Sequence, residues 1–339
     1  MSAETNVKGI NASALPAGER KILVENIYIN FPRFNRVSEK IAHCHQHSKI
    51  AAEPICMLIT GQTGAGKTTL RKVYEKKFPR RQNKEGIISP ILSALIPVPA
   101  TAKSLVTRLL NKLGDPMAAR GTTATQTLRL IKLIHECKVE LIFLDEFQHF
   151  IDQESNHILQ TVANWLKDLL NETEVPMILT GMPSSDIILQ ANAQLERRFK
   201  MRERLDPFGW ETPAQQTEYR AFLRYLDDSL PLAERSHLSD SELAFRIYYA
   251  TGGVIGHMMD LIRHASNLAI ARSMNRLDHE LLAESYDECL SARRSNPINP
   301  FRAEIEQLHA KPVKDRDKEF SGNPFDRGRK AGVKSDHKM

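Results

Sequence analysis

The first half of the chain alternates between short apolar runs and longer amphipathic stretches. Apolar runs of strand length lie at residues 55–60, 89–98, 139–144 and 175–180, and their near-continuous hydrophobicity is typical of buried parallel strands. The more polar segment 199–205 is a candidate fifth strand. Helical periodicity lies between them, at residues 68–78, 102–113, 125–137 and 155–170. Because strands that alternate with helices form a parallel sheet with helices on both faces, we expect an α/β domain.

The second half of the chain has a different pattern. From Pro213 to about Arg294 helical periodicity dominates, with a break at Gly252-Gly253, which predicts a small all-helical second domain. Residues 311–339 have almost no apolar periodicity and hold nine Lys and Arg against five Asp and Glu. Such a segment cannot bury a core, so we expect a disordered basic tail. Asn-Pro-Phe occurs at 299–301 and 323–325, where it suits a docking motif and where chance explains it equally well.

The composition of the chain limits the classes of protein to which it can belong, but it does not indicate a function. A length of 339 residues suggests two domains, and no apolar run approaches the 18 residues of a membrane-spanning helix. The N-terminus lacks the pattern of a secretion signal. Four widely spaced cysteines with no CxxC pair indicate reduced thiols, as in a bacterial cytoplasm. The net charge of +6, of which the tail supplies +4, permits contact with nucleic acid.

One motif carries specific chemistry. Gly61-Gln62-Thr63-Gly64-Ala65-Gly66-Lys67-Thr68 matches G-x-x-x-x-G-K-[ST] between a predicted strand and a predicted helix. Its glycines let backbone N–H groups surround a phosphate, with Thr69 continuing the helix whose N-terminus adds partial positive charge. Lys67 is expected to reach the β- and γ-phosphates, and the Thr68 hydroxyl to bind Mg²⁺.

A pair of acids at a strand end completes this chemistry. Asp145 and Glu146 follow the apolar run 141–144, 78 residues beyond Lys67. Asp145 would hold the magnesium, and Glu146 would polarise a water for attack on the γ-phosphate. Two adjacent acids at a buried strand end are rare for packing alone, because each carboxylate needs a partner. The guanine-reading N-K-x-D pattern is missing, since Asp115 stands one residue late after Asn111-Lys112, so ATP is the expected nucleotide.

These motifs, in this order, resemble the AAA+ ATPases and, among them, the transposition regulators of the TniB/TnsC kind. The resemblance covers roughly residues 25–294. It includes the P-loop and the acid pair, together with these further segments: Tyr28-Ile29, Pro32-Arg33-Phe34, Gln148-His149, Leu179-Thr180-Gly181-Met182-Pro183, Leu195-Glu196-Arg197-Arg198-Phe199 and Asp206-Pro207-Phe208.

The resemblance implies further catalytic roles. Thr180 would be the sensor 1 residue, hydrogen-bonding near the γ-phosphate or the attacking water. Arg197 or Arg198 would be an arginine finger that completes the nucleotide site of a neighbouring subunit, although a surface basic pair is the alternative. His257 occupies the sensor 2 position, where the family often has arginine. A neutral imidazole does not replace a permanent charge, so a sensor 2 contact is not assured by the resemblance.

The resemblance also implies contacts to DNA through helix ends and loops that face the inside of a ring or spiral. Lys103, Arg120, Thr122 and Thr123 flank the two helices between the second and third predicted strands. They could hold phosphates without reading bases, while ordinary helix capping by Thr122 is an equally good reading. A second basic block, residues 71–84, has seven Lys and Arg and one acid. We interpret it as a solvated helix face that runs into a loop.

The sequence therefore predicts an AAA+ P-loop NTPase with a parallel sheet flanked by helices, a small C-terminal helical lid domain and a disordered tail. The expected parts are an N-terminal extension (1–24), the nucleotide-binding domain (25–210), the lid (211–294) and the tail (295–339). By resemblance, the protein would oligomerise with ATP and Mg²⁺ on duplex DNA as a ring or filament, recruit a DDE transposase and disassemble on hydrolysis. A target-selecting protein would be a further partner. The tail would be the transposase contact. A replication helicase or clamp loader, and a signalling ATPase without DNA, are the alternatives.

Overall fold

The computed structural model describes residues 12–48, 50, 53–84, 86–151, 156–293 and 298–309. These residues form two compact units, each with its own core. One unit spans residues 30–206, and the other joins the N-terminal residues up to Ile29 to the chain from Pro207 onward. Each unit is described by itself below. None of the described helices is both long and apolar enough to cross a membrane.

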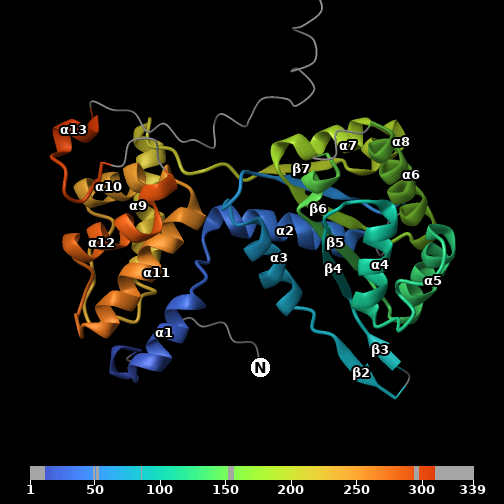
Figure 1. The fold of residues 1–339 in the computed structure, drawn as a ribbon, viewed down its shortest axis with the longest axis horizontal. Helices are drawn as coiled ribbons and strands as arrows, with labels where there is room; N and C mark the ends of the chain where they lie inside the picture. The colour runs from blue at the N-terminus through green and yellow to red at the C-terminus, as the bar shows by residue number, and fades with distance from the viewer. Residues whose placement is uncertain are drawn as a thin grey trace, which may run out of the picture. The chain divides into compact units, whose positions relative to one another are not determined.

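The first unit is an α/β domain built on five parallel strands (Figure 1). The strands are β1 (Met57–Thr60), β4 (Ile91–Leu95), β5 (Leu141–Asp145), β6 (Met177–Gly181) and β7 (Met201–Arg204). Their order across the sheet is β4-β5-β6-β1-β7, so β6 lies between β1 and β5. Every pairing is parallel, which confirms the sheet and the strands that the apolar runs predict.

Helices cover this sheet because its central strands are mostly apolar, with polar residues near their carboxyl ends. The helices of the unit are α2 (Pro32–His47), α3 (Lys67–Lys76), α4 (Ala102–Leu113), α5 (Thr123–Glu136), α6 (Asn156–Thr173), α7 (Asp186–Gln190) and α8 (Ala193–Arg198). All five residues of β5 and of β6 are buried, as expected of strands covered on both faces.

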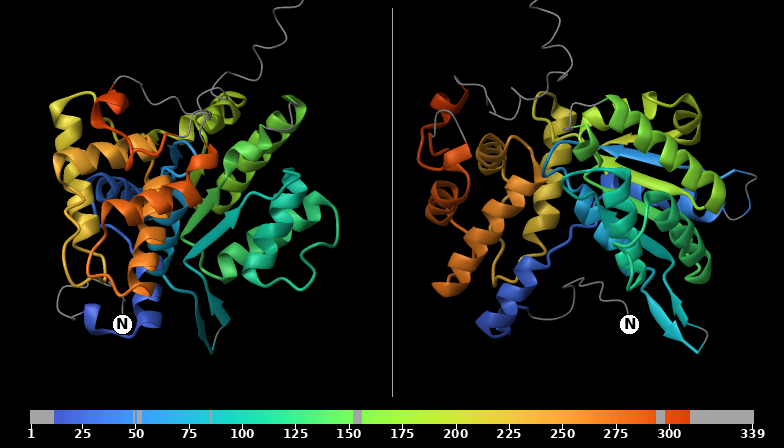
Figure 2. Two further views of the ribbon diagram at one scale, coloured as in Figure 1. Left: turned by 60° about the vertical axis from the view of Figure 1, so that its left-hand side comes forward. Right: turned by 45° about the vertical axis from the view of Figure 1, so that its right-hand side comes forward.

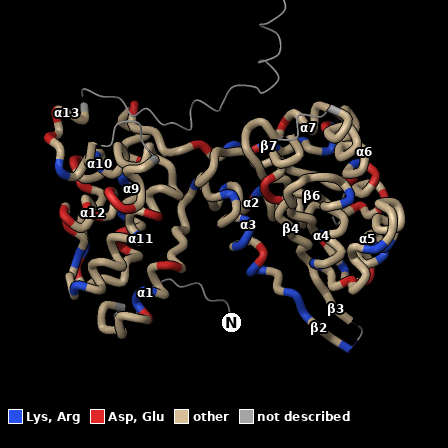
Figure 3. Tube along the Cα trace, viewed as in Figure 1, with Lys and Arg blue, Asp and Glu red and all other residues tan. Residues whose placement is uncertain are grey.

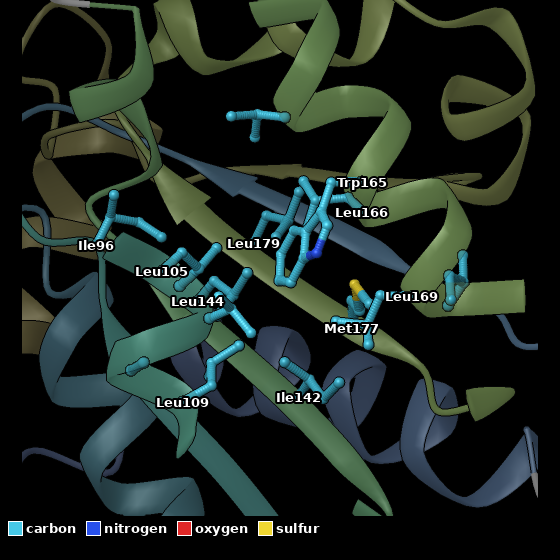
Figure 4. Close-up of a cluster of buried hydrophobic side chains, with 14 of the residues drawn as sticks. Ile96, Leu105, Leu109, Ile142, Leu144, Trp165, Leu166, Leu169, Met177 and Leu179 are labelled. Atoms are coloured by element: carbon cyan, nitrogen blue, oxygen red, sulfur yellow. The ribbon is translucent and has the colours of Figure 1, made fainter. Parts of the chain in front are cut away.

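On one face of the sheet, side chains of α4 and α6 pack against alternate residues of β5 and β6. Leu109 and Leu166 meet Ile142, Leu144 and Leu179 in a continuous apolar cluster (Figure 4). Strand residues two apart share a face, so the same strands present their other residues to the opposite side. The core thereby fixes the ends of β1, β5 and β6, which carry the residues of interest.

The sequence interpretation missed a small antiparallel hairpin between α3 and β4. It consists of β2 (Arg81–Asn83) and β3 (Gly86–Ile88), and Figure 2 shows it projecting from the α/β unit. The basic block 71–84 therefore continues from a helix into a strand, where we expected a loop. With three residues each, these strands are too short to give a periodicity signal.

The second unit is helical, as predicted for the chain after Pro213. It contains α9 (Pro213–Asp227), α10 (Ser241–Thr251), α11 (Ile255–Ala271) and α12 (His279–Cys289). It also contains α1 (Ala17–Glu25), which packs on α11. Val24 is fully buried, and the Arg20 side chain donates to the Pro231 carbonyl at 2.9 Å. The described part of the expected N-terminal extension thus belongs to the helical unit.

The expected tail boundary at residue 295 is wrong for residues 298–309. Phe301 is buried and its ring contacts Tyr286 edge-on, with ring centroids 6.5 Å apart. The buried Arg246 guanidinium donates to the carbonyls of Pro300 at 2.5 Å and Ala303 at 2.7 Å. A short helix, α13 (Ile305–His309), follows. The first Asn-Pro-Phe motif is therefore part of the folded unit, and residues 310–339, with the second motif, lie outside the described residues.

Candidate nucleotide-binding site

The candidate site begins where β1 ends and the chain turns into α3. Gly64 and Gly66 adopt positive φ angles of 80° and 94°, a conformation that other residues rarely accept. Gly61 has a different requirement, because a Cβ there would lie 2.6 Å from the Leu205 carbonyl oxygen. Two positions of the motif thus need glycine for backbone conformation and one needs it for close packing, as expected of a tight loop whose amides face a ligand.

Lys67 is the first residue of α3, and its side chain is held inside this loop. The residue is 5% exposed, and Nζ donates to the carbonyls of Gly61 at 2.6 Å and Gln62 at 3.0 Å. Burial lowers the pKa of the ammonium group, and the nearby Glu146 and Asp145 carboxylates oppose that shift. The ammonium group therefore lies where phosphate oxygens would replace backbone carbonyls as its partners.

The Asp145 carboxylate is hydrogen-bonded to the P-loop helix, to Glu146 and to β6. It is fully buried at the end of β5, and both carboxylate oxygens are hydrogen-bonded. Oδ2 accepts from the Thr68 hydroxyl at 2.9 Å and from the guanidinium of Arg71 at 3.3 Å. Oδ1 accepts from the Thr180 hydroxyl at 2.6 Å and from the Glu146 amide at 3.0 Å. Residues predicted from three separate motifs thus meet at one carboxylate.

Glu146 has an unusual backbone and a defined side-chain partner. Its φ of 61° and ψ of 44° place it in the left-handed region, which costs free energy for a residue with a Cβ. Its carboxylate accepts from the Gln148 amide, whose oxygen accepts from the Met182 amide at 3.0 Å. A Cβ on Gly181 would lie 2.9 Å from that same oxygen. Gln148 therefore links the acid to the loop after β6.

Arg71 is a site residue that the sequence interpretation missed. Besides Asp145, its guanidinium contacts the Glu75 carboxylate at 2.7 Å and the Ser93 hydroxyl at 2.6 Å. It thus compensates the charge of a carboxylate that has no access to water. The only sequence signal was the four-residue spacing of Arg71 and Glu75 on a helix, which does not identify the partner on β5.

The two arginines of α8 differ in their surroundings. Arg198 pairs with Glu53 at 3.2 Å and donates to the Asn171 side chain at 3.2 Å. Its carbonyl accepts from Cys56, directly before β1, so it lies at the edge of the sheet away from the P-loop. Arg197 is exposed, and no side-chain partner is recorded for it among the described residues. Arg197 is consequently the guanidinium that is available to another molecule.

The four candidate DNA contacts lie on neighbouring elements. Lys103 is exposed in the first turn of α4, which Thr101 and Ser104 cap reciprocally. Thr122 is the N-cap of α5, and Thr123 is its first residue, so the capping interpretation holds for Thr122. Arg120 is exposed in the preceding loop. The first turn of α5 lies beside the middle of α4, because the Gln126 amide donates to the Thr107 hydroxyl at 2.8 Å.

His257 lies in the helical unit. It is near the start of α11, and its Nδ1 is 3.3 Å from the Thr251 carbonyl oxygen. This contact uses one ring nitrogen within the unit itself. A role for His257 as sensor 2 stays a prediction.

The donor set fits a magnesium–nucleotide complex. Among the described residues there is no group of three or more His, Cys, Asp and Glu that could hold a metal by itself. Magnesium commonly binds through one or two protein groups together with substrate phosphates. The Thr68 hydroxyl and Asp145 carboxylate, 2.9 Å apart beside the loop, are a pair of that kind.

Comparison with solved structures identifies the fold. The chain is similar to the ORC2 protein of Aeropyrum pernix, described with ADPNP and ADP (TM-score 0.58, 16% identity, 86% of this chain and 75% of that chain). It is also similar to Cdc6p of Pyrobaculum aerophilum (0.59, 16%, 86% and 74%) and to A. pernix ORC1 in complex with DNA (0.51, 14%, 79% and 69%). The chain therefore has the AAA+ P-loop fold.

The family follows from the sequence. Residues 21–209 match the family described as bacterial TniB protein, which is more than half of the chain, so the chain belongs to the TniB family. No curated protein sequence gives a significant match. The α/β unit lies almost wholly within the matched range, and the helical unit lies mostly beyond it.

Proposed function

We propose that this chain is an ATP-dependent, DNA-binding regulator of transposition that acts in the bacterial cytoplasm. ATP drives its oligomerisation on target duplex DNA. The assembly recruits a DDE transposase with the help of a target-selecting protein, and hydrolysis disassembles it. The proposal is supported by membership of the TniB family and, above all, by the single carboxylate of Asp145 that joins Thr68, Thr180 and the acid pair.

The chemistry follows from the positions of these side chains. The P-loop amides and Lys67 bind the phosphates, and Thr68 and Asp145 hold Mg²⁺, which neutralises phosphate charge when bound. Glu146 accepts a proton from the attacking water. Gln148 orients that carboxylate through its hydrogen bond, and the Thr180 hydroxyl hydrogen-bonds to the Asp145 carboxylate.

Assembly requires a group from a second subunit. Arg197 is exposed at the end of α8, whereas Arg198 is engaged by Glu53 and Asn171. We therefore assign the arginine finger to Arg197. A guanidinium that reaches a neighbour's nucleotide neutralises phosphate charge only when subunits stack, so nucleotide links the assembly together.

Duplex DNA is held at the helix ends of the α/β unit. Lys103 and Arg120 supply charge, and the N-termini of α4 and α5 supply amides and hydroxyls. Such contacts position the protein on the phosphate backbone without reading the sequence. The transposase contact is assigned to residues 310–339, since residues 298–309 are folded.

The experiment is nucleotide-dependent assembly on duplex DNA. With a non-hydrolysable ATP analogue, the wild-type protein is expected to form large complexes on a duplex, measured by light scattering. Lys67→Ala is expected to abolish them, and Lys132→Ala, an exposed lysine on α5, to leave them unchanged. Assembly by Lys67→Ala would overturn the assignment of the site. Preference for single strands would favour the replication alternative, and absence of salt-sensitive DNA binding would favour the signalling alternative.

A further inference from the structure

The end of α3 and the following hairpin carry a row of exposed cations, here called the basic ribbon. It consists of Lys72, Lys76, Lys77, Arg81 and Lys84, all of them exposed. The chain runs directly from α3 into β2, so these side chains follow one another along a continuous surface. Figure 3 shows the positive residues along α3 and β2.

These charges are not neutralised within the described part of the α/β unit. No ion pair is recorded there for any of the five side chains, and the nearby acid Glu75 is engaged by Arg71 at 2.7 Å. Lys77 has only a contact to the Tyr74 ring, 5.9 Å from its centroid. A row of uncompensated like charges raises the local potential and attracts a polyanion.

The hairpin is attached firmly at its base. Arg80 donates to the carbonyls of Lys112 and Leu113 at the end of α4, at 3.2 and 3.3 Å. On the other strand, the Ser89 amide donates to the Cys137 carbonyl at the end of α5, at 2.8 Å. The hairpin is therefore held between the C-terminal ends of two helices.

Burial does not explain why the chain forms this hairpin. All three residues of β2 are exposed, and β3 has no fully buried residue. A two-stranded ribbon with so little apolar contact gains little stability from its own packing. Its fixed attachment and its charge suit a surface that contacts another molecule.

The kind of molecule that binds the basic ribbon follows from the absence of strongly exposed large hydrophobic side chains in it. No large hydrophobic side chain is strongly exposed among the described residues 71–88. Protein partners bind through an apolar core surrounded by a polar rim, whereas phosphates require only cations and donors. The chemistry therefore favours a nucleic-acid backbone over an acidic protein.

We propose that the basic ribbon binds the phosphate backbone of the duplex at a second point, beyond the N-terminal ends of α4 and α5. The proposal rests on the proposed function. The ribbon lies near the C-terminal ends of these helices, and a 12-residue helix is about 18 Å long. The two contacts are then roughly 20 Å apart, or about 6 base pairs at about 3.4 Å each.

The test is the salt dependence of duplex binding by Arg81→Glu/Lys84→Glu. A 30-base-pair duplex and a non-hydrolysable ATP analogue are the probes, and fluorescence anisotropy measures affinity between 50 and 300 mM salt. The matched control is Lys132→Glu/Lys200→Glu, which changes the net charge equally at two exposed positions. Since no side-chain contact of Arg81 or Lys84 is recorded in the described structure, the unfolding midpoint is expected to stay unchanged.

If the ribbon binds phosphates, the plot of log affinity against log salt concentration for Arg81→Glu/Lys84→Glu has a slope that is smaller in magnitude by about two units. The affinity of this variant at low salt also falls roughly tenfold or more. The control variant shows neither change. A wild-type slope and affinity in this variant, with Lys103→Glu still impaired, would overturn the inference and leave the proposed function intact. Absence of duplex binding by the wild-type protein would overturn both. If Arg81→Glu/Lys84→Glu instead loses binding to a polyglutamate peptide and keeps wild-type binding to the duplex, the partner of the ribbon is an acidic protein and the inference is overturned.

Discussion

Asp145 shows how one buried carboxylate organises residues that are far apart in the sequence. Four donors satisfy its two oxygens, and they come from the P-loop helix, from β6 and from the adjacent amide. A buried charge is tolerated only when it is paired and hydrogen-bonded. The hydrogen bonds that satisfy Asp145 are therefore the same ones that bring the proposed catalytic groups together.

Glu146 is expected to be needed for hydrolysis and not for nucleotide binding. Glu146→Gln keeps the side-chain volume and removes the proton acceptor, so the turnover rate should fall about 10²- to 10⁴-fold. Nucleotide affinity should stay close to that of the wild type, and complexes on duplex DNA should last longer. Single-turnover hydrolysis measures the effect, with Glu136→Gln on the exposed face of α5 as control. Normal turnover in Glu146→Gln would remove Glu146 from the role of base.

Thr180 is expected to contribute to both stability and turnover. Thr180→Val keeps the shape and removes the 2.6 Å hydrogen bond to Asp145, which is a bond to a charged acceptor. The free energy of unfolding should fall by about 2 kcal/mol, and turnover should fall while nucleotide affinity changes little. Denaturant unfolding and steady-state kinetics measure the two effects. Thr217→Val, which loses an exposed bond to Pro213, serves as control; equal behaviour of the two variants would contradict the network.

At the scale of elements, apolar runs predicted the four strands β1, β4, β5 and β6, because buried parallel strands leave a continuous hydrophobic signal. The strand β7 has the sequence Met-Arg-Glu-Arg and lacks this signal, and it was expected only as a candidate fifth strand. The hairpin β2–β3 was missed because its strands have only three residues each, too few for a periodicity to show. The P-loop and acid pair could be located from local motifs. Arg71 could not, and Gln148 was noted only as part of the resemblance without a role, because the roles of both depend on partners that only the folded chain brings near.

The folding of segment 298–309 was likewise not predictable from the local sequence. Its attachment depends on partners that are distant in the sequence: the ring of Phe301 packs on Tyr286, and a buried arginine binds its backbone. Arg246 donates to two carbonyls of the segment and contacts Glu242 at 2.8 Å. Nothing in the local sequence indicates that a helix 54 residues away supplies these donors.

Arg246→Met is expected to release this segment. Methionine keeps the apolar stem and leaves the carbonyls of Pro300 and Ala303 unpaired, so the segment should open more often. Trypsin should then cleave after Arg302 roughly tenfold faster, because cleavage follows the population of the open form. Mass spectrometry of short digests measures the rate. Arg272→Met, which removes only an exposed pair with Glu284, is the control; equal rates would contradict the anchoring role.

At the scale of the whole molecule, the chain order does not match the division into units. The helix α1 precedes the α/β unit in sequence and packs with helices that follow it, as Asn267 of α11 and Glu25 confirm with a 3.0 Å hydrogen bond. The chain therefore enters the helical unit first, leaves it for residues 30–206 and returns. Domain boundaries drawn from composition missed this because α1 has only a weak apolar pattern with one buried residue.

The central claim is that one subunit's nucleotide is completed by the neighbour's Arg197. A subunit that cannot bind nucleotide still carries an intact arginine, and a subunit without the arginine still carries an intact P-loop. Two variants that are inactive alone should therefore restore each other's function when they meet at an interface.

The most direct measurement is the ATPase rate of a mixture of Lys67→Ala and Arg197→Ala on duplex DNA. Each variant alone is expected to be nearly inactive. Random association in a 1:1 mixture places the two intact halves together at about one interface in four, so the mixture should recover up to about a quarter of the wild-type rate. A mixture of Lys67→Ala with Arg197→Ala/Glu146→Gln should stay inactive. A rate no higher than the mean of the two separate variants would contradict the account.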